Sequence, residues 1–206
     1  MSENGMAYSV TYIEASPEHV EDVVQCIRDI LYATMSVRGH RESYALQRIG
    51  QAHHFVVASA WDGLSAWEKY LTQRETLSLD GRMAEWLLAP LDRRVHHALS
   101  VGDGWDTASS GFYAVTHVDV IPPAKEEGTA LIKSIADACR AKGGNIRFDA
   151  LTQEDRPNHM TVIEAWAGAD AQVGHMTAPH TKAYRDALAP LCGALYDERI
   201  YMRVPG

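Results

Sequence analysis

The sequence predicts an α+β protein made of two copies of one unit, joined by a short linker. Three observations support this prediction: an internal repeat, an alternation of strands and helices within each copy, and a polar stretch between the copies. A shift of 105 positions aligns the copies without a gap from one end to the other. The shift pairs identical residues throughout: Tyr8 with Tyr113, Val10 with Val115, Pro17 with Pro122, Ile27 with Ile132, Gly39 with Gly144, His54 with His159, Trp61 with Trp166, Asp92 with Asp197 and Arg94 with Arg199. A repeat at one fixed spacing is the signature of duplicated units.

Each copy is expected to begin with a strand and continue with a helix. The strands are predicted at 7–15 and 112–121, where β-branched and aromatic residues alternate with polar ones. In the first copy, Ser16 and Pro17 are typical of a helix start. The apolar residues at 20, 23, 24, 27, 30 and 31 then fall on one helical face. Gly39 and the pair Gly143-Gly144 are expected to close the two helices.

The rest of each copy predicts a strand, a polar turn, a longer strand, helix and a last strand. The strands are expected at 44–49, 55–61 and 93–101, and again at 148–153, 160–166 and 198–204. The order β-α-β-β-α-β is the ferredoxin-like plan, in which helices cover one face of an antiparallel sheet. The other face needs a partner, and the second copy can supply it, so the two sheets are expected to pair into an intramolecular barrel. We expect the first copy at 6–100, the linker at 101–111 and the second copy at 112–204.

Composition and charge exclude several classes of function. Of the 206 residues, 46% are apolar and 22% are charged, as in an ordinary globular protein. A net charge of −8 argues against a nucleic-acid partner. No apolar run is long enough to cross a membrane, and the first residues lack the pattern of a secretion signal. The cysteines lack Cys-x-x-Cys spacing and are expected to be reduced thiols of a cytoplasmic protein: Cys26, Cys139 and Cys192.

The most distinctive pattern lies in the second copy. A strand ends in Glu164-Ala165-Trp166, a histidine follows nine residues later at His175, and a Thr-x-Pro-His step ends at 180. Together with "VTHVDVIPP" (115–123), "RPNHMTVIEAW" (156–166) and "YDERIY" (196–201), this pattern resembles the antibiotic biosynthesis monooxygenase family of dimeric α+β barrels. The first copy is similar more weakly. It keeps Trp61 but has Tyr70 at the position of His175.

The resemblance implies a chemistry. Family oxygenases that use neither metal nor flavin oxidise electron-rich phenols by letting the substrate anion pass an electron to O2 in a dry pocket. Such a pocket needs a base, a donor for the developing oxyanion and exclusion of water. His175 would be the base, the indole N–H of Trp166 the donor, and Glu164 would orient or tune the histidine. The expected partners are a small aromatic molecule and O2, with no cofactor.

Further residues are expected to line the substrate pocket: His117, Val162, His180, Tyr184 and Arg185 in the second copy, and Trp61 and Tyr70 in the first. Each candidate also has a purely structural interpretation. A tryptophan at a strand end usually belongs to the core, and a histidine can simply line a pocket. Glu164 is replaced by Ser59 in the first copy, so the fold itself does not require a carboxylate there.

Two departures from the family pattern concern cofactors and the oxyanion. Many family oxygenases carry an asparagine four residues before the tryptophan, and this chain has Val162 and Val57 there. Neither copy therefore has that side-chain amide. The haem-degrading branch uses a histidine at the positions of Arg185 and Asp80, so we expect no haem. A metal site is not expected either, because no His-x-His or His-x-x-x-His spacing occurs. The adjacent histidines 53 and 54 should point to opposite faces of a strand.

Other functions remain open at this point. The same fold could serve as a non-catalytic binder of an aromatic ligand, as an isomerase or cyclase, or as a metal-dependent enzyme. The first copy could be structural, could shape access of the substrate, or could bind an aromatic ligand without converting it. The tandem repeat predicts an intramolecular pseudo-dimer and leaves open whether the chain also pairs with a second copy of itself.

Overall fold

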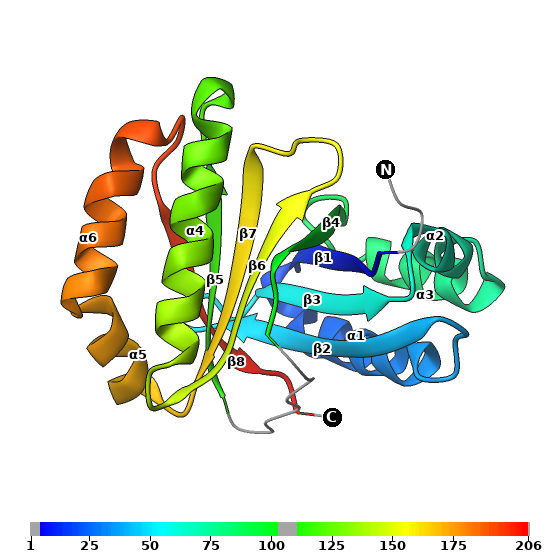
Figure 1. Cartoon of the computed structure of the whole chain (residues 1–206). Coiled ribbons are helices and arrows are strands. Elements are labelled where there is room, and N and C mark those ends of the chain that lie inside the picture. Colours follow the sequence, from blue (N-terminus) through cyan, green and yellow to red (C-terminus); the bar gives the residue numbers. More distant parts are fainter. Residues whose placement is uncertain (1–4, 103–110, 206) are drawn as a thin grey trace. The chain divides into compact units, whose positions relative to one another are not determined.

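The structure is a computed structural model that describes residues 5–102 and 111–205 (Figure 1). The contacts within the chain divide it into two compact units. The first contains the residues up to His97 together with those from Arg203 onward, and the second contains Ala98–Met202. Most of the predicted linker, 103–110, lies outside the described residues. No helix within the described residues is long and apolar enough to cross a membrane.

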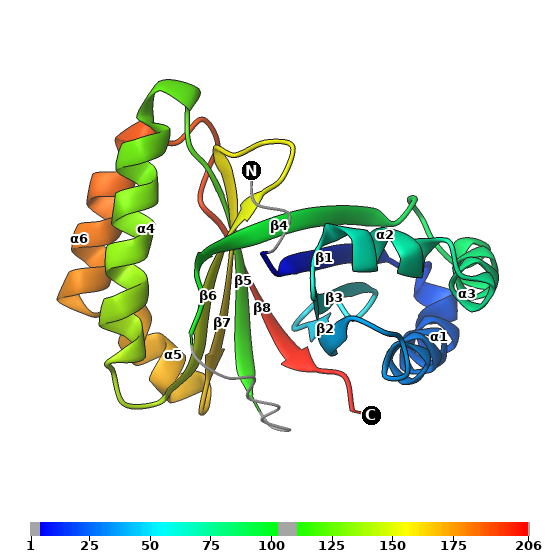
Figure 2. The same cartoon turned by 45° about the vertical axis from the view of Figure 1, so that its right-hand side comes forward.

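The first unit has one antiparallel sheet with helices packed against it. Its elements are β1 (Ala7–Glu14), η1 (Pro17–His19), α1 (Val20–Thr34), β2 (His40–Arg48), β3 (His54–Trp61), α2 (Leu64–Leu71), α3 (Arg74–Ala84) and β4 (Asp92–Ser100). Strand β1 pairs with both β3 and β4, and β2 pairs with β3, which gives the order β4-β1-β3-β2. Figure 2 shows α1 and α3 side by side, where Arg82 of α3 contacts Asp29 of α1 at 2.5 Å.

The second unit repeats this plan. Its elements are β5 (Phe112–Asp119), η2 (Pro122–Ala124), α4 (Lys125–Arg140), β6 (Asn145–Gln153), β7 (His159–Trp166), α5 (Ala169–Met176), α6 (Pro179–Leu188), η3 (Ala189–Leu191) and β8 (Asp197–Arg203). The pairing of β5 with β7 and β8, and of β6 with β7, gives the order β8-β5-β7-β6. Helices α4 to α6 cover one face of this sheet (Figure 1).

The repeat read from the sequence is confirmed in three dimensions. Each strand and each α-helix of the second unit begins 105 positions after its counterpart in the first, as in 7 and 112 for the first strands or 64 and 169 for α2 and α5. Both units have the β-α-β-β-α-β order, so the predicted ferredoxin-like α+β fold is confirmed.

Each unit has its own core between sheet and helices. In the first, Val23, Ile27 and Cys26 of α1 pack with Phe55 of β3 and Met83 of α3. In the second, residues of α4 pack against the sheet with Trp166 and with Leu188 of α6: Ile132, Ile135, Ala136 and Cys139. The apolar stripe that the helical spacing predicts is therefore the face that each helix buries.

The loops after the long helices differ from the expectation. Helices α1 and α4 end at Thr34 and Arg140, several residues before the glycines that were expected to close them. Gly39 and Gly144 instead introduce the next strand in a left-handed conformation, with φ of 88° and 86°. A Cβ at Gly39 would lie 2.8 Å from the Cβ of Ala66, so glycine is needed both for its backbone and for the close approach of α2.

Candidate active site

The second unit brings a carboxyl group, an indole and an imidazole together inside its core. Glu164 and Trp166 alternate along β7 and therefore share one face of the sheet, while His175 lies near the end of α5. Each of the three side chains belongs to a residue that is no more than 3% exposed. The candidate catalytic residues predicted from the sequence thus lie together.

The three groups contact one another directly. The indole Nε1–H of Trp166 donates a hydrogen bond to Oε2 of Glu164 at 2.9 Å. The imidazole of His175 stacks on the indole, with ring centroids 4.7 Å apart and an angle of 22° between the planes. Nε2 of His175 lies 3.5 Å from the same Glu164 oxygen. In this arrangement the indole N–H is already engaged by the carboxyl group.

The second nitrogen of His175 faces a different pair of groups. Nδ1 lies 3.2 Å from the hydroxyl of Thr181 and 3.5 Å from the thiol of Cys139. Contacts at both nitrogens and the stacked indole hold the imidazole in one orientation. Positioning of this kind is what a group that handles protons requires.

Burial changes the ionisation of Glu164. Removal from water raises the pKa of its carboxyl group from 4.5 to about 7, and the hydrogen bond from Trp166 opposes part of that rise. Among the nearby charges, Glu198 raises this pKa further and Arg185 lowers it. Near neutral pH, Glu164 therefore exists in both its protonated and its ionised form.

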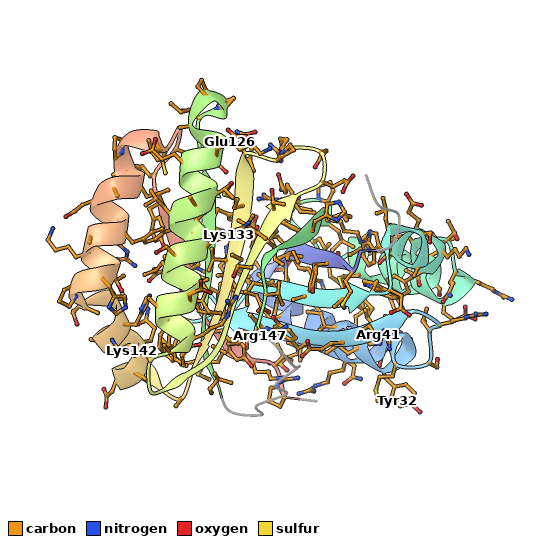
Figure 3. The ribbon with its side chains drawn as sticks, in the orientation of Figure 1. Tyr32, Arg41, Glu126, Lys133, Lys142 and Arg147 are labelled. Carbon is orange, nitrogen blue, oxygen red and sulfur yellow. The ribbon has the colours of Figure 1, made fainter. Side chains whose placement is uncertain are left out.

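Burial has the opposite consequence for His175. Its pKa falls from 6.5 to about 4, first because of burial and then because of electrostatic interactions with Lys142, His180 and Arg185 that disfavour a charged imidazole. Lys142 follows α4 (Figure 3), and its Nζ donates to the backbone oxygen of Gly174 at 2.8 Å. His175 is uncharged at neutral pH, so its contact with Glu164 joins a carboxyl group to a neutral imidazole and is not an ion pair.

A polar group at the edge of the cluster links α6, β8 and α5. Nη2 of Arg185 contacts Oε2 of Glu198 at 2.5 Å, and Nε2 of Gln172 donates to Oε1 of Glu198 at 3.3 Å. Nε of Arg185 is buried and has no hydrogen-bond partner among the described residues. A buried donor without a partner is rare in proteins, and this one could serve a bound molecule.

The first unit keeps the same geometry with different chemistry. Nε1–H of Trp61 donates to the hydroxyl of Ser59 at 2.8 Å. The ring of Tyr70 stacks on Trp61, with centroids 4.8 Å apart and an angle of 30°. Burial raises the pKa of the Tyr70 hydroxyl above its ordinary value of 10. A serine and a weakly acidic phenol thus replace the carboxyl group and the imidazole.

These side chains line a cavity between the sheet and the helices of the first unit. The cavity has a volume of about 40 Å³, more than the roughly 10–15 Å³ that one water molecule needs. The lining combines aromatic rings with hydroxyl groups, and it includes Trp61, Trp67, Tyr70, Thr11, Ser43 and Ser59. Asp80 and Arg93, which contact each other at 2.5 Å, also belong to it.

Comparison with known proteins decides the family. A family model described as antibiotic biosynthesis monooxygenase matches residues 6–77 and 111–187 of this chain. The chain belongs to the antibiotic biosynthesis monooxygenase family. The resemblance seen in the sequence is therefore confirmed for both units. No protein of curated function matches the sequence.

Solved structures similar to this chain share its tandem arrangement. A protein of Fusobacterium nucleatum described as a monooxygenase has a TM-score of 0.86 at 15% identity, covering 98% of this chain and 94% of that one. One from Lactobacillus acidophilus, also described as a monooxygenase, has a TM-score of 0.78 at 11% identity and covers 97% and 94%. An anthrone oxidase-like protein has a TM-score of 0.76 at 12% identity and covers 98% and 92%. At such identities, these structures establish the fold alone.

Of the other residues predicted to line the substrate pocket, some lie on the same side of the sheet as Glu164 and one lies on the opposite side. Val162 lies on the same face of β7 as Glu164 and pairs across the sheet with Thr116. His117 follows Thr116 on β5 and so faces the opposite side of the sheet, away from Glu164. Tyr184 of α6 is buried in the same core as Trp166.

His180 lies beside the cluster without a hydrogen bond to it. Its ring centroid is 6.1 Å from that of His175. Its Nε2 is buried and has no hydrogen-bond partner among the residues that the structure describes. Together with Cys139, the two histidines offer three donor atoms within 4.8 Å of one another, a group that could hold a metal ion.

Sequence reasoning missed several side chains that surround the cluster: Cys139, Lys142, Gln172, Thr181 and Glu198. One signal was available. At the shift of 105 positions, Asp80 aligns with Arg185 and Arg93 with Glu198, so opposite charges exchange places. Such an exchange predicts that the two positions contact each other, as they do in both units.

The prediction for the adjacent histidines was wrong. His53 and His54 were expected to point to opposite faces, but their ring centroids are 4.3 Å apart. The alternation rule does not apply to them, because β3 begins at His54 and His53 belongs to the preceding turn.

Proposed function

We propose that this protein is an oxygenase that uses the Glu164–Trp166–His175 cluster of its second unit to oxidise a small aromatic, phenolic or polyketide-type substrate with O2, as a step of secondary metabolism. Neither metal nor flavin takes part in the proposed reaction. The observation that carries the proposal is the contact of a carboxyl group, an indole and an imidazole, all buried, at positions where the first unit has serine, indole and phenol.

The contrast between the units supports a functional reason for the carboxyl group. In the first unit, a serine hydroxyl satisfies the indole N–H, so holding the tryptophan does not require an acid. Burying a carboxyl group is costly, and the raised pKa of Glu164 reflects that cost. A costly group that the fold does not need is a good candidate for chemistry.

The ionisation of the two groups favours Glu164 as the base. A general base works best when its pKa lies near the working pH, and the pKa of Glu164 is about 7. His175, with a pKa of about 4, would remain a neutral imidazole that orients the carboxylate. The proposal therefore exchanges the roles that the sequence suggested for these two residues, while both stay in the catalytic set.

The proposed reaction balances without another reactant. A phenol and O2 give a quinone and water. Glu164 takes the phenolic proton, the resulting anion passes an electron to O2, and the two radicals combine into a peroxide on a ring carbon. The O–O bond and the C–H bond of that carbon then break, and the inner oxygen atom stays as the quinone carbonyl. The outer oxygen atom leaves as water, with the hydrogen of the broken C–H bond and the proton that Glu164 returns. Exclusion of bulk water from the buried cluster would protect the radical pair and strengthen the electrostatic effect of each group.

The test is an O2-consumption screen of the chelator-treated full chain with phenols, anthrones and hydroquinones. The proposal predicts O2 uptake with at least one compound class, and loss of that uptake in Glu164→Gln. Uptake that is unchanged in Glu164→Gln would reject the proposed site. Failure of every compound class to increase O2 uptake would count against the oxygenase function.

A specific observation favours a second candidate function, the binding of an aromatic ligand without turnover. The first unit has a cavity whose walls include the rings of Trp61, Trp67 and Tyr70. Stacking on such rings suits a flat aromatic molecule. If the protein only binds such molecules, the phenols, anthrones or hydroquinones should quench its tryptophan fluorescence without any O2 uptake. Trp67→Leu should then weaken that binding.

A further inference from the structure

The first unit contains a second group of metal-binding side chains, at the turn between β2 and β3. One carboxylate oxygen of Glu14 and one ring nitrogen each of His53 and His54 all lie within 4.8 Å of one another. All three residues are partly exposed, so an ion can reach them from solvent. None of them belongs to the candidate active site.

The strand register explains why these side chains meet. Glu14, the last residue of β1, lies directly opposite His54, the first residue of β3. The next pair carries the backbone hydrogen bond, from Ala15 N to His53 O at 2.8 Å. Glu14 and His54 therefore form a pair without backbone hydrogen bonds, in which side chains approach most closely. His53 lies in the turn and places its ring beside that of His54.

The donor set matches a known metal chemistry. We propose that Glu14, His53 and His54 bind a divalent transition-metal ion of the zinc class. Imidazole nitrogen and carboxylate oxygen are common zinc ligands, with bonds of about 2.0–2.2 Å. Around one tetrahedral ion such donor atoms lie roughly 3.4 Å apart. The three donor atoms lie within 4.8 Å of one another, so no pair needs to close by more than about 1.4 Å. Side chains that are partly exposed can make that movement, and water would complete the coordination.

The second unit provides an internal comparison for this site. At the equivalent positions it has Asp119, Asn158 and His159. Nδ1 of His159 contacts Oδ1 of Asp119 at 2.7 Å, so the pair of carboxylate and imidazole is present there as well. Asn158, however, donates its side-chain N–H to the backbone oxygen of Val120 and supplies no imidazole. The second imidazole, from His53, distinguishes the first unit.

Metal binding here would have a structural effect. An ion held by Glu14, His53 and His54 ties the end of β1 to the turn that precedes β3. A metal that binds only the folded chain raises the free energy of unfolding by RT ln(1 + c/Kd), where c is the free metal concentration. The site is independent of the proposed oxygen chemistry, because none of its residues touches Glu164, Trp166 or His175 in any contact described above.

The experiment is a zinc titration of the untagged full chain, followed by calorimetry and by elemental analysis after dialysis. His53→Asn copies the residue that the second unit uses at this position, so the fold should tolerate it. We expect this variant to lose one bound zinc equivalent or to bind zinc about tenfold or more weakly. Even the loss of a residue that only hydrogen-bonds to a metal ligand lowers metal affinity by about tenfold or more. Glu14→Gln should show the same loss.

The matched control is His159→Asn in the second unit, which should bind zinc like the unchanged chain. Any zinc bound by Cys139, His175 and His180 would be present in the unchanged chain and in every variant. It would therefore not contribute to the difference in zinc content between them. Zinc should also raise the melting temperature of the unchanged chain more than that of His53→Asn. Equal zinc content and affinity in the unchanged chain and in His53→Asn would overturn the proposal.

Discussion

The two units of this chain share a backbone plan and differ in the chemistry that it holds. Trp61 and Trp166 each sit at the end of the equivalent strand, donate to the side chain two residues earlier, and stack on a ring from the following helix. In the first unit the acceptor is Ser59, and in the second it is Glu164. The difference separates what the fold requires, a satisfied indole, from what the second unit adds, a buried acid.

The ion pairs beside the two tryptophans make the same distinction. Asp80 of α3 pairs with Arg93 of β4 in the first unit, and Arg185 of α6 pairs with Glu198 of β8 in the second. The fold keeps a helix-to-strand ion pair at this position, whichever element carries the positive charge. In the second unit the pair acts on a buried carboxyl group, because Glu198 raises the pKa of Glu164 and Arg185 lowers it. In the first unit it acts on a phenol, because Asp80 raises the pKa of the Tyr70 hydroxyl and Arg93 lowers it.

The largest effect is expected from Glu164→Gln. The amide oxygen can still accept the hydrogen bond of Trp166, so the core should stay intact, but the amide cannot take a proton. Turnover of a true substrate should fall by about 100-fold or more, the usual scale for a lost general base. Steady-state O2 uptake measures it, and a melting curve serves as the control for folding. A loss of turnover smaller than about threefold would mean that Glu164 is not the base.

Trp166→Phe should have a smaller effect with a distinct signature. The phenyl ring keeps most of the packing, but Glu164 loses the hydrogen bond that lowers its pKa. A hydrogen bond to a charged group is worth about 1.5–3 kcal/mol, or roughly one to two pKa units. The rate at neutral pH should therefore fall about tenfold, and the pH at half-maximal rate should move upward. Trp61→Phe, the matched change in the first unit, should leave that pH unchanged.

The dependence of stability on pH gives a test that needs no substrate. The pKa of Glu164 is raised from 4.5 to about 7 in the folded chain, so its contribution to stability is present below about pH 4.5 and is lost as pH rises through about 7. The pKa of His175 is lowered from 6.5 to about 4, so its contribution is present above about pH 6.5 and is lost as pH falls through about 4. The two contributions oppose each other in the unchanged chain.

Glu164→Gln removes the first contribution and keeps the second. The free energy of unfolding of this variant, relative to the unchanged chain, should rise between about pH 5 and about pH 7. Urea titrations at several pH values measure it. A difference that stays constant over this range would show that the pKa of Glu164 is not raised by folding.

Removal of metal should have the smallest effect on turnover. The reaction proposed for the second unit uses no metal ion, so the turnover rate after chelation should lie within about twofold of the rate before it. Cys139→Ser should not change the sensitivity of the rate to chelators. Elemental analysis before and after chelation supplies the control. Copper, iron or zinc that is lost in step with activity would instead favour a metal at Cys139, His175 and His180.

Much of the fold could be predicted from the sequence, because the repeat made each unit a check on the other. The alternation in the first strands, the helical stripe at 20–31 and the shared tryptophans all describe short-range patterns that folding preserves. The ends of α1 and α4 were less predictable. Gly39 and Gly144 adopt a left-handed conformation just before the next strand, and they allow the following helix to approach closely. In the sequence alone, a glycine in this role looks the same as a glycine that ends a helix.

The candidate site could be predicted only in part. Glu164, Trp166 and His175 were found from their pattern, but their ionisation could not be, because it depends on burial and on distant charges such as Lys142. The pairing of His53 with His54 was missed for a related reason. Whether a residue begins a strand or ends a turn decides the direction of its side chain, and the boundary between them shifts by one residue with little change in the sequence pattern.

The central claim is that the second unit does the chemistry while the first keeps only its geometry. Its most direct test is O2 uptake by His175→Ala and Tyr70→Phe, measured side by side on the same substrate, with melting curves to exclude unfolding. We predict that His175→Ala loses about 100-fold in turnover, because the carboxylate loses the neutral partner that orients it and misplacement of a catalytic group costs about that much. Tyr70→Phe should change turnover little. Near-normal turnover in His175→Ala, together with its loss in Tyr70→Phe, would contradict this account and assign the reaction to the first unit.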